Sequence, residues 1–280
     1  MEQSLLKQLK INAAKVRLGI LEGVYHAKSG HPGSSLSAAD MITYLYFHEM
    51  RIDPKNPKWE DRDRFVLSKG HGAPALYAAL ALKGYFEMEE MAKLRHVGAM
   101  LQGHPDMKGT PGVDMSTGSL GQGISAACGI ALAGKLSGKD YRVYALLGDG
   151  ELEEGQVWEA AMFASHRKLD NLTALIDYND LQISGHLRDV CSPEPISDKF
   201  EAFGFHVISI DGHDFSQIDN AVQQAKSIKN KPTAIIAATH KGQGVSFMQD
   251  NVGWHGVAPN KEQYEIAVSE LEQYLSDLEG

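Results

Sequence analysis

Two strand-like runs, each followed by an oxygen-bearing side chain, constrain this chain more than any other feature. The first run, 142–147, leads into Gly148-Asp149-Gly150, and the second run, 172–178, leads into Asn179. A helical stretch lies between them, so the segment predicts a βαβ unit. Because parallel neighbouring strands end at the same edge of a sheet, Asp149 and Asn179 should lie side by side.

These two side chains favour a metal-bridged phosphate ligand at this edge. Carboxylate and carboxamide oxygens suit a hard cation such as Mg²⁺ or Ca²⁺. The glycines on either side of Asp149 would let a phosphate approach the backbone at a switch point of the sheet. Asp and Asn are also common turn residues after strands, and on these two residues alone the turn interpretation stays open.

Strand-like and helical segments alternate along the chain, which predicts an α/β, doubly wound and mostly parallel sheet. Apolar spacing predicts an opening and a closing amphipathic helix, and a second helix capped by Ser35 or Ser37. Further strands are expected at 64–67, 205–210 and 234–238, a helix at 215–228, and long loops at 182–198 and 241–260. No repeat or linker interrupts residues 1–280, which we expect to form a single domain.

Composition argues against several classes of function. The net charge is −9 over 280 residues, which argues against nucleic acid and anionic membranes as partners. Two cysteines, Cys128 and Cys191, indicate no disulfide framework and fit a reducing compartment. The polar first ten residues and the lack of a membrane-spanning apolar run lead us to expect a soluble, cytoplasmic protein.

Four histidines lie beside glycine in predicted loops: His31, His71, His104 and His255. A lone histidine in a turn is usually a surface residue, but the repetition favours a shared role. Zinc binding is a poor interpretation, because these histidines lack close-pair spacing and have no cysteine companions. Imidazoles around a polyhydroxylated phosphate substrate make better chemical sense.

A glycine-rich run at 118–123 continues into a loose dinucleotide-binding pattern at 121–126. No clear strand precedes that pattern, and in the GDG segment Glu153 stands where the third glycine belongs, so the nucleotide interpretation fails. A glycine turn that lets the backbone approach a flat ring fits better, with Leu120 as its apolar contact. Lys241 follows a strand beside glycines, and is either a solvated charge or a point charge that neutralises a phosphate.

Together these segments resemble transketolase. The similarity covers almost the whole chain and is carried, in order, by AKSGHPGSSLSAAD, DRFVLSKGHGAPALYA, QGHPDMKGTPGVDMSTGSLGQGIS, the GDG segment, FEAFGFHVISIDGHD, and KGQG with GWHG. The resemblance implies a thiamine diphosphate-binding domain. It also implies transfer of a two-carbon ketol unit from a ketose phosphate to an aldose phosphate, through a dihydroxyethyl-thiamine diphosphate intermediate, in the pentose phosphate pathway.

The resemblance also implies roles for individual residues. Asp149, Asn179 and the backbone carbonyl of Leu181 would hold Mg²⁺ or Ca²⁺ against the thiamine diphosphate. Further cofactor contacts are implied for Ser34, His71, Gly118, Ser119, Leu120, Gly150, Lys241 and His255. Glu154 is assigned to the same set, near a dimer contact that communicates between sites. His31, His104 and His255 would face the sugar hydroxyls and shuttle protons, and together with His71 they form the implied catalytic set.

Single-chain transketolases continue with a pyrimidine-binding domain and a C-terminal domain, whereas this chain stops after the first domain. The family's activating glutamate and its phosphate-binding arginines lie in the absent part. The resemblance therefore implies the N-terminal subunit of a split transketolase, active only with a partner chain in an α2β2 heterotetramer. A split thiamine enzyme with another sugar or sulfo-sugar acceptor, a non-catalytic cofactor-binding module and a truncated longer enzyme stay open as alternatives.

Overall fold

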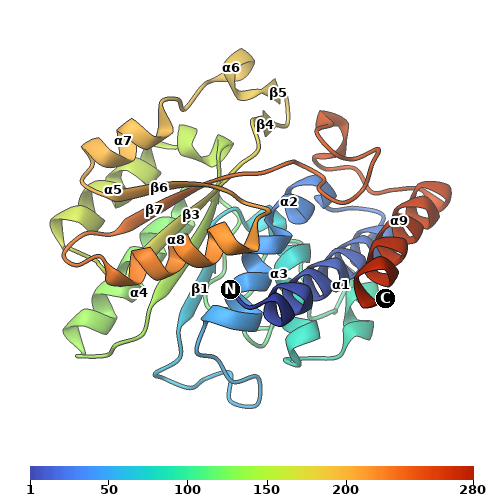
Figure 1. The fold of residues 1–280 in the computed structure, drawn as a ribbon, viewed down its shortest axis with the longest axis horizontal. Coiled ribbons are helices and arrows are strands. Elements are labelled where there is room, and N and C mark those ends of the chain that lie inside the picture. The colour runs from blue at the N-terminus through green and yellow to red at the C-terminus, as the bar shows by residue number, and fades with distance from the viewer.

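A five-stranded parallel sheet lies at the centre of the computed structural model, which describes all 280 residues (Figure 1). The strand order is β1-β2-β3-β7-β6, and all neighbours run parallel. These strands are β1 (Arg64–Leu67), β2 (Val143–Gly148), β3 (Leu172–Tyr178), β6 (His206–Asp211) and β7 (Thr233–Ala238). A separate antiparallel ribbon pairs β4 (Leu181–Gln182) with β5 (Gly185–His186). The predicted α/β class with a parallel sheet is confirmed.

Helices cover both faces of the sheet and enclose two apolar cores. One core contains residues of α1 (Gln3–Ala27), α2 (Pro32–Tyr44), α3 (Ala73–Lys83), α8 (Phe215–Ser227) and α9 (Lys261–Glu279). The other contains residues of α4 (Gln122–Leu136), α5 (Gly155–His166) and α7 (Ile196–Ala202). Successive side chains of a strand alternate between the cores, as Leu146 and Leu147 of β2 do. Burial on both faces explains why the strands are continuous apolar runs in the sequence.

The connections leave the sheet toward opposite faces. After β1 the chain continues into α3, and after β7 into α9; these two helices pack in the first core. After β2 it continues into α5, and after β3 into α7; these two helices pack in the second core. The carboxyl ends of β1, β2, β3 and β7 therefore lie among loops that diverge, which is where α/β folds bind ligands.

The expected cap of the second helix was wrong. Helix α2 begins at Pro32 with His31 in the N-cap position, so Ser35 and Ser37 lie inside the helix. Proline is favoured in the first turn because its missing N–H has no partner there anyway. The hydroxyl of Ser35 instead donates to the carbonyl of His31. The last turn, Leu45–Glu49, is π-helical.

Other boundaries also differ from expectation. The segment Gly150–Glu153 forms a 3-10 turn, so α5 starts only at Gly155. The predicted loop at 182–198 contains part of the β4–β5 ribbon, the short helix α6 (Leu187–Val190) and the start of α7. Short 3-10 turns lie at Gly70–Gly72, Met88–Lys93 and Val252–Trp254. No helix combines the length and the apolar character needed to cross a bilayer.

Candidate active site

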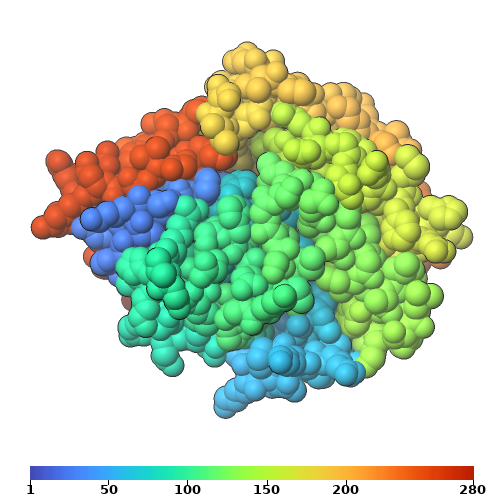
Figure 2. Space-filling view, turned by 180° about the vertical axis from the view of Figure 1, so that it is seen from behind, coloured from blue at the N-terminus to red at the C-terminus, as the bar shows by residue number.

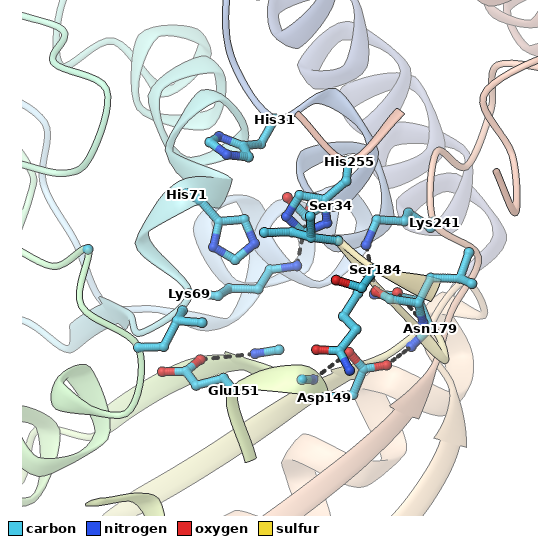
Figure 3. A pocket seen from close by; sticks show the side chains of 17 residues that line it. His31, Ser34, Lys69, His71, Asp149, Glu151, Asn179, Ser184, Lys241 and His255 are labelled. Atoms are coloured by element: carbon cyan, nitrogen blue, oxygen red, sulfur yellow. Dashed lines mark hydrogen bonds between the residues drawn. The ribbon is translucent and has the colours of Figure 1, made fainter. Parts of the chain in front are cut away.

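A cavity of about 380 Å³ opens at the carboxyl ends of β1, β2, β3 and β7 (Figure 3). The predicted residues that line it are His31, Ser34, His71, Gly118, Leu120, Asp149, Gly150, Asn179, Leu181, Lys241 and His255. On the surface, the segment near residue 185 (yellow) borders a hollow between the red and green parts of the chain (Figure 2). Segments far apart in sequence therefore share one site.

Three predicted residues lie outside this lining. The side chain of Ser119 and that of Glu154, the N-cap residue of α5, are exposed. His104 is also exposed, but its ring lies against Gly118, where an added Cβ would come within 3.2 Å of it. The structure thus places His104 at the rim, and it leaves Ser119 and Glu154 beside the cavity wall.

Asp149 connects the ends of the two central strands. Its Oδ2 accepts hydrogen bonds from the backbone N–H groups of Asn179 and Asp180, both at 2.7 Å, and its Oδ1 accepts one from Gly150 at 2.8 Å. Burial, together with the nearby carboxylate of Asp177, raises the pKa of Asp149 to about 6. A cation beside Asp149 would favour its ionised form.

The oxygens around Asp149 suit a divalent cation. The amide of Asn179 donates to Asp177 at 3.4 Å, while its oxygen accepts from the N–H of Leu181 at 3.2 Å. The carbonyl of Leu181 accepts from the ammonium of Lys241 at 2.6 Å. No cluster of three or more His, Cys, Asp or Glu side chains could hold a metal ion. A cation here would therefore use carboxylate, amide and carbonyl oxygens together with oxygens of its ligand, as Mg²⁺ often does.

Lys69 also lines the cavity, although the sequence motifs predicted no role for it. Its side chain is 1% exposed, forms an ion pair with Asp177 and donates to the carbonyl of Ser34 at 2.8 Å. The hydroxyls of Ser37 and Thr239 also donate to Asp177. Burial alone would raise the pKa of Asp177, but Lys69 and these donors outweigh it and hold the pKa below its usual range.

A second buried lysine lies in the loop after β7. Lys241 is 1% exposed, and burial lowers the pKa of its ammonium to about 8, with Asp149 acting in the opposite direction. Gly33 leaves space for its stem, since an added Cβ there would lie 3.0 Å from Cγ of Lys241. Lys69 is already paired with Asp177, but Lys241 forms no ion pair, and a buried ammonium without a counter-ion favours an anionic ligand.

Three histidine rings gather opposite the strand ends. The ring centroids of His31, His71 and His255 lie 5.2–5.6 Å apart. Burial, reinforced by nearby cationic groups, lowers the pKa of His31 to about 4, that of His255 to about 3 and that of His71 well below its usual value. All three are therefore neutral at pH 7, and each has one nitrogen that donates and one that accepts.

Several polar atoms of this site have no partner. Nδ1 of His31, Nδ1 of His255 and Oγ of Ser34 are buried and make no hydrogen bond. Buried polar groups in proteins are almost always hydrogen-bonded, so three unpartnered polar atoms that line one cavity indicate a polar ligand.

The loops at 70–72 and 117–118 meet backbone to backbone. An added Cβ at Gly70 would lie 2.7 Å from the backbone nitrogen of Gly118, so glycine is required at position 70. The contact brings Gly118 and Leu120 to the cavity as its largely uncharged side. One wall is thus suited to a flat ring, and the strand ends are suited to a metal-bound anion.

Five lining residues were missed from the sequence: Gln182, Ile183 and Ser184 of the β4–β5 ribbon, and the two buried residues Lys69 and Glu151. Lys69 lies between a polar residue and glycine after a buried strand, which is the same context that drew attention to Lys241. Glu151 follows the GDG motif directly, but its partners come from distant loops. Lys69 thus had a usable signal in the sequence, whereas Glu151 had none.

The profile described as "Transketolase, thiamine diphosphate binding domain" matches residues 7–272. The chain belongs to the transketolase family. Members of this family are transferases, and the matched domain is the one that binds thiamine diphosphate. The cation-compatible oxygens, the buried lysines and the orphaned polar atoms fit that cofactor.

Two relatives match over nearly their whole length. The chain is 50% identical to the 6-deoxy-6-sulfo-D-fructose transketolase subunit SqwG of Clostridium sp. (strain MSTE9), over 95% of this chain and 96% of that one. It is 42% identical to an apulose-4-phosphate transketolase subunit of Phocaeicola vulgatus, over 98% and 97% of the two chains. This transketolase chain thus has the extent of relatives that are named as subunits.

Other transketolases are more than twice as long. Human transketolase is 45% identical over 96% of this chain, which covers 43% of the human protein. The transketolase structure from Campylobacter jejuni superimposes with a TM-score of 0.86 at 32% identity, over 100% of this chain and 48% of that chain. The chain therefore spans less than half the length of these transketolases.

Proposed function

We propose that this chain is the N-terminal, thiamine diphosphate-binding subunit of a split transketolase that transfers a two-carbon ketol unit from a ketose phosphate to an aldose phosphate. We assign it to the pentose phosphate pathway and to a reducing compartment such as the cytoplasm, where Cys128 and Cys191 stay free thiols. The observation that carries the proposal is the cavity itself. It combines the oxygens of Asp149, Asn179 and Leu181 and two buried lysines with unpartnered polar atoms, in a chain of this family.

The cofactor would be held mainly from the strand ends. Thiamine diphosphate supplies, when bound, a nucleophilic ring carbon and an electron sink for cleavage of a carbon–carbon bond. Asp149, Asn179 and the carbonyl of Leu181 would hold Mg²⁺ or Ca²⁺. Lys241 neutralises diphosphate charge as a buried cation, because it lies next to the same carbonyl.

The remaining lining residues hold the rest of the cofactor and the substrate. Ser34, His71, Gly118 and Gly150 contact the cofactor, and Leu120 contacts its ring. His31 and His255 are neutral in the free protein, so they orient substrate hydroxyls through the nitrogens that lack partners. Negative charge that develops on the substrate would raise their pKa values and let them accept a proton, with His104 assisting from the rim.

A partner chain would complete the site. The two relatives of the same extent are named as subunits, which supports a second subunit for this chain. We propose that the partner carries the pyrimidine-binding domain, the activating glutamate and the arginines for the substrate phosphate, in an α2β2 assembly. Ser119 and Glu154, exposed beside the cavity, would lie at that contact.

A second candidate is the same ketol transfer on a different sugar. The relative at 50% identity is named for 6-deoxy-6-sulfo-D-fructose and the one at 42% for apulose 4-phosphate. A sulfonate and a phosphate are both anions, and the residues that would distinguish them belong to the proposed partner.

Native purification with identification of every co-purifying chain tests the proposal first. We expect a stoichiometric partner with a pyrimidine-binding domain. Transfer activity should be lost when the complex is stripped of thiamine diphosphate and metal, and should return when both are added back. Assays with fructose 6-phosphate and with 6-deoxy-6-sulfofructose as donors would separate the two candidates. Transfer that is indifferent to the cofactor would contradict both, and cofactor binding without any transfer would indicate a non-catalytic module.

A further inference from the structure

One buried carboxylate beside the cavity has no role in the chemistry proposed above. Glu151 lies in the 3-10 turn after Asp149, and its side chain is 2% exposed. No lysine, arginine or histidine forms an ion pair with it. An unpaired buried charge is unfavourable unless several donors stabilise it, so its position calls for an explanation.

The charge of Glu151 is held by donors from three different segments. Oε1 accepts from the hydroxyl of Ser68 at 2.5 Å and from the backbone N–H of Gly121 at 2.8 Å. Oε2 accepts from the backbone N–H of Gly148 at 3.1 Å. Figure 3 shows the carboxylate of Glu151 at the cavity with a hydrogen bond to a backbone nitrogen. One side chain thus connects the ends of β1 and β2 with the loop that precedes α4.

Each of these segments carries a different part of the cavity. The loop at 118–121 supplies Gly118 and Leu120, and the turn at 148–150 supplies Asp149. Close packing leaves little room for adjustment between them, since an added Cβ at Gly123 would lie 2.5 Å from Cα of Ser68. Glu151 hydrogen-bonds to both the loop that forms the ring wall and the metal-binding turn, so the spacing between them depends on this side chain.

We propose that Glu151 is a positioning residue that fixes this spacing, so that one cofactor molecule reaches the ring wall and the metal-binding turn at the same time. The inference rests on the proposed thiamine diphosphate site. A carboxylate suits the task better than an amide, because both of its oxygens accept hydrogen bonds. A glutamine would turn an NH₂ donor toward one of the N–H groups and leave that group unsatisfied.

The test compares two ligands on Glu151→Gln, Ser68→Ala and a matched control. The ligands are thiamine diphosphate and inorganic diphosphate, each with Mg²⁺, titrated calorimetrically into the full chain together with its co-purifying subunit. The control is Asp63→Asn, because Asp63 is also buried and accepts two backbone N–H bonds, from Arg51 and Arg142, but lies at the opposite end of β1.

We expect Glu151→Gln to weaken thiamine diphosphate binding by roughly tenfold to a hundredfold, the equivalent of one or two lost charge-assisted hydrogen bonds. Inorganic diphosphate does not reach the ring wall, so its affinity should change by less than about threefold. Ser68→Ala should show the same selectivity to a smaller extent, because two donors remain. Asp63→Asn should lower the unfolding temperature while both affinities stay unchanged.

Two results would overturn the inference. Equal thiamine diphosphate affinity in Glu151→Gln and the unaltered chain would show that the spacing does not depend on this carboxylate. An equal loss for both ligands would show that Glu151 only supports the diphosphate turn. Failure of the unaltered chain to bind thiamine diphosphate would instead contradict the proposed function, so the two failures are distinguishable.

Discussion

Both ends of the sheet contain a buried carboxylate that accepts backbone hydrogen bonds, but the carboxyl end also places two buried lysines beside a cavity. At the amino end, Asp63 accepts from the backbone N–H groups of Arg51 and Arg142, both at 2.8 Å. At the carboxyl end, Asp149 accepts from those of Asn179 and Asp180, both at 2.7 Å. In both places a buried carboxylate joins neighbouring segments through backbone donors. These hydrogen bonds alone therefore do not show which carboxylate belongs to a ligand site and which only supports the fold.

The burial of the counter-charges and the presence of a cavity distinguish the two ends, whereas unpartnered polar atoms occur at both, among them Nε of Arg142 and Oδ1 of Asn171 at the amino end. Arg51, the ion-pair partner of Asp63, has 44% of its side chain exposed, and Lys135, the partner of Asp170, has 35% exposed. Lys69 and Lys241, by contrast, are almost fully buried beside a cavity whose lining includes His31, with its unpartnered nitrogen. Buried lysines together with unpartnered atoms that line a cavity therefore mark the carboxyl end as the candidate ligand-binding end.

The largest expected effect comes from removing a counter-charge at each end. Lys69→Met leaves Asp177 as an uncompensated buried charge and should lower the free energy of unfolding by about 3–5 kcal/mol. Lys135→Met removes a half-exposed partner of Asp170 and should lower it by less than about 1 kcal/mol. Chemical denaturation of both variants measures the difference.

A rescue variant sharpens this comparison. The double change Lys69→Met with Asp177→Leu removes both charges and should regain much of the lost stability, because a buried pair can often be replaced by apolar residues. The hydroxyls of Ser37 and Thr239 would lose their acceptor, so full recovery is not expected. Equal destabilisation by the two lysine variants would show that burial of the counter-charge does not separate the two ends.

A smaller effect is expected from filling the close backbone approach at the carboxyl end. Gly70→Ala would place a Cβ 2.7 Å from the backbone nitrogen of Gly118. This overpacking should lower the free energy of unfolding by about 1–3 kcal/mol. Gly129→Ala is the control, since no atom lies within 4 Å of an added Cβ there and alanine favours its helix, α4, by about 0.5–1 kcal/mol. Thermal unfolding should move in opposite directions in the two variants.

The smallest effect concerns acid sensitivity. His31 is neutral in the folded protein, where burial lowers its pKa to about 4 from the ordinary 6.5. Protonation therefore favours the unfolded chain, and the stability that neutral His31 contributes is complete above pH 6.5 and is lost as the pH falls through 4. The raised pKa of Asp149, about 6, acts in the opposite direction, because its unfavourable ionisation is relieved below pH 6.

Unfolding temperatures between pH 7 and pH 4 test the contribution of His31. His31→Gln should flatten the acid decline, whereas a control change at the exposed His166 on α5 should leave the slope unchanged. Asp170 lies at the amino end. Burial would raise its pKa, but Lys135 and the N–H of Asn230 outweigh burial and hold the pKa below its usual range. The stability that ionised Asp170 contributes is therefore lost only below about pH 4. An unchanged slope in His31→Gln would show that other titrating groups cause the decline in unfolding temperature.

The sequence was most informative where residue patterns follow strand ends. The strands at 64–67 and 172–178 were predicted with their observed bounds, because both are apolar runs flanked by polar loop residues. The placement of Asp149 beside Asn179 followed from parallel pairing alone. Resemblance to a family supplied most of the remaining lining residues.

Other features depend on tertiary packing and left no local signal. Glu151 accepts from Gly121, thirty positions away, and such a contact exists only once both loops are in place. The helix start at Pro32 was misjudged because serine is a common N-cap residue, whereas here proline and the packing of His31 determine the boundary. Pairing of Lys69 with Asp177 likewise joins positions 108 residues apart.

That separation has a consequence for how the protein could be monitored. Lys69 and Lys241 face one cavity from loops on either side of the two central strands, so the site forms only when the whole sheet has assembled. A ligand that binds there binds the completed fold alone and shifts the folding equilibrium by mass action, by about 2.7 kcal/mol at a hundred times its dissociation constant. Ligand binding at this cavity therefore reports complete folding, and a shortage of the cofactor would lower the fraction of the protein that is folded.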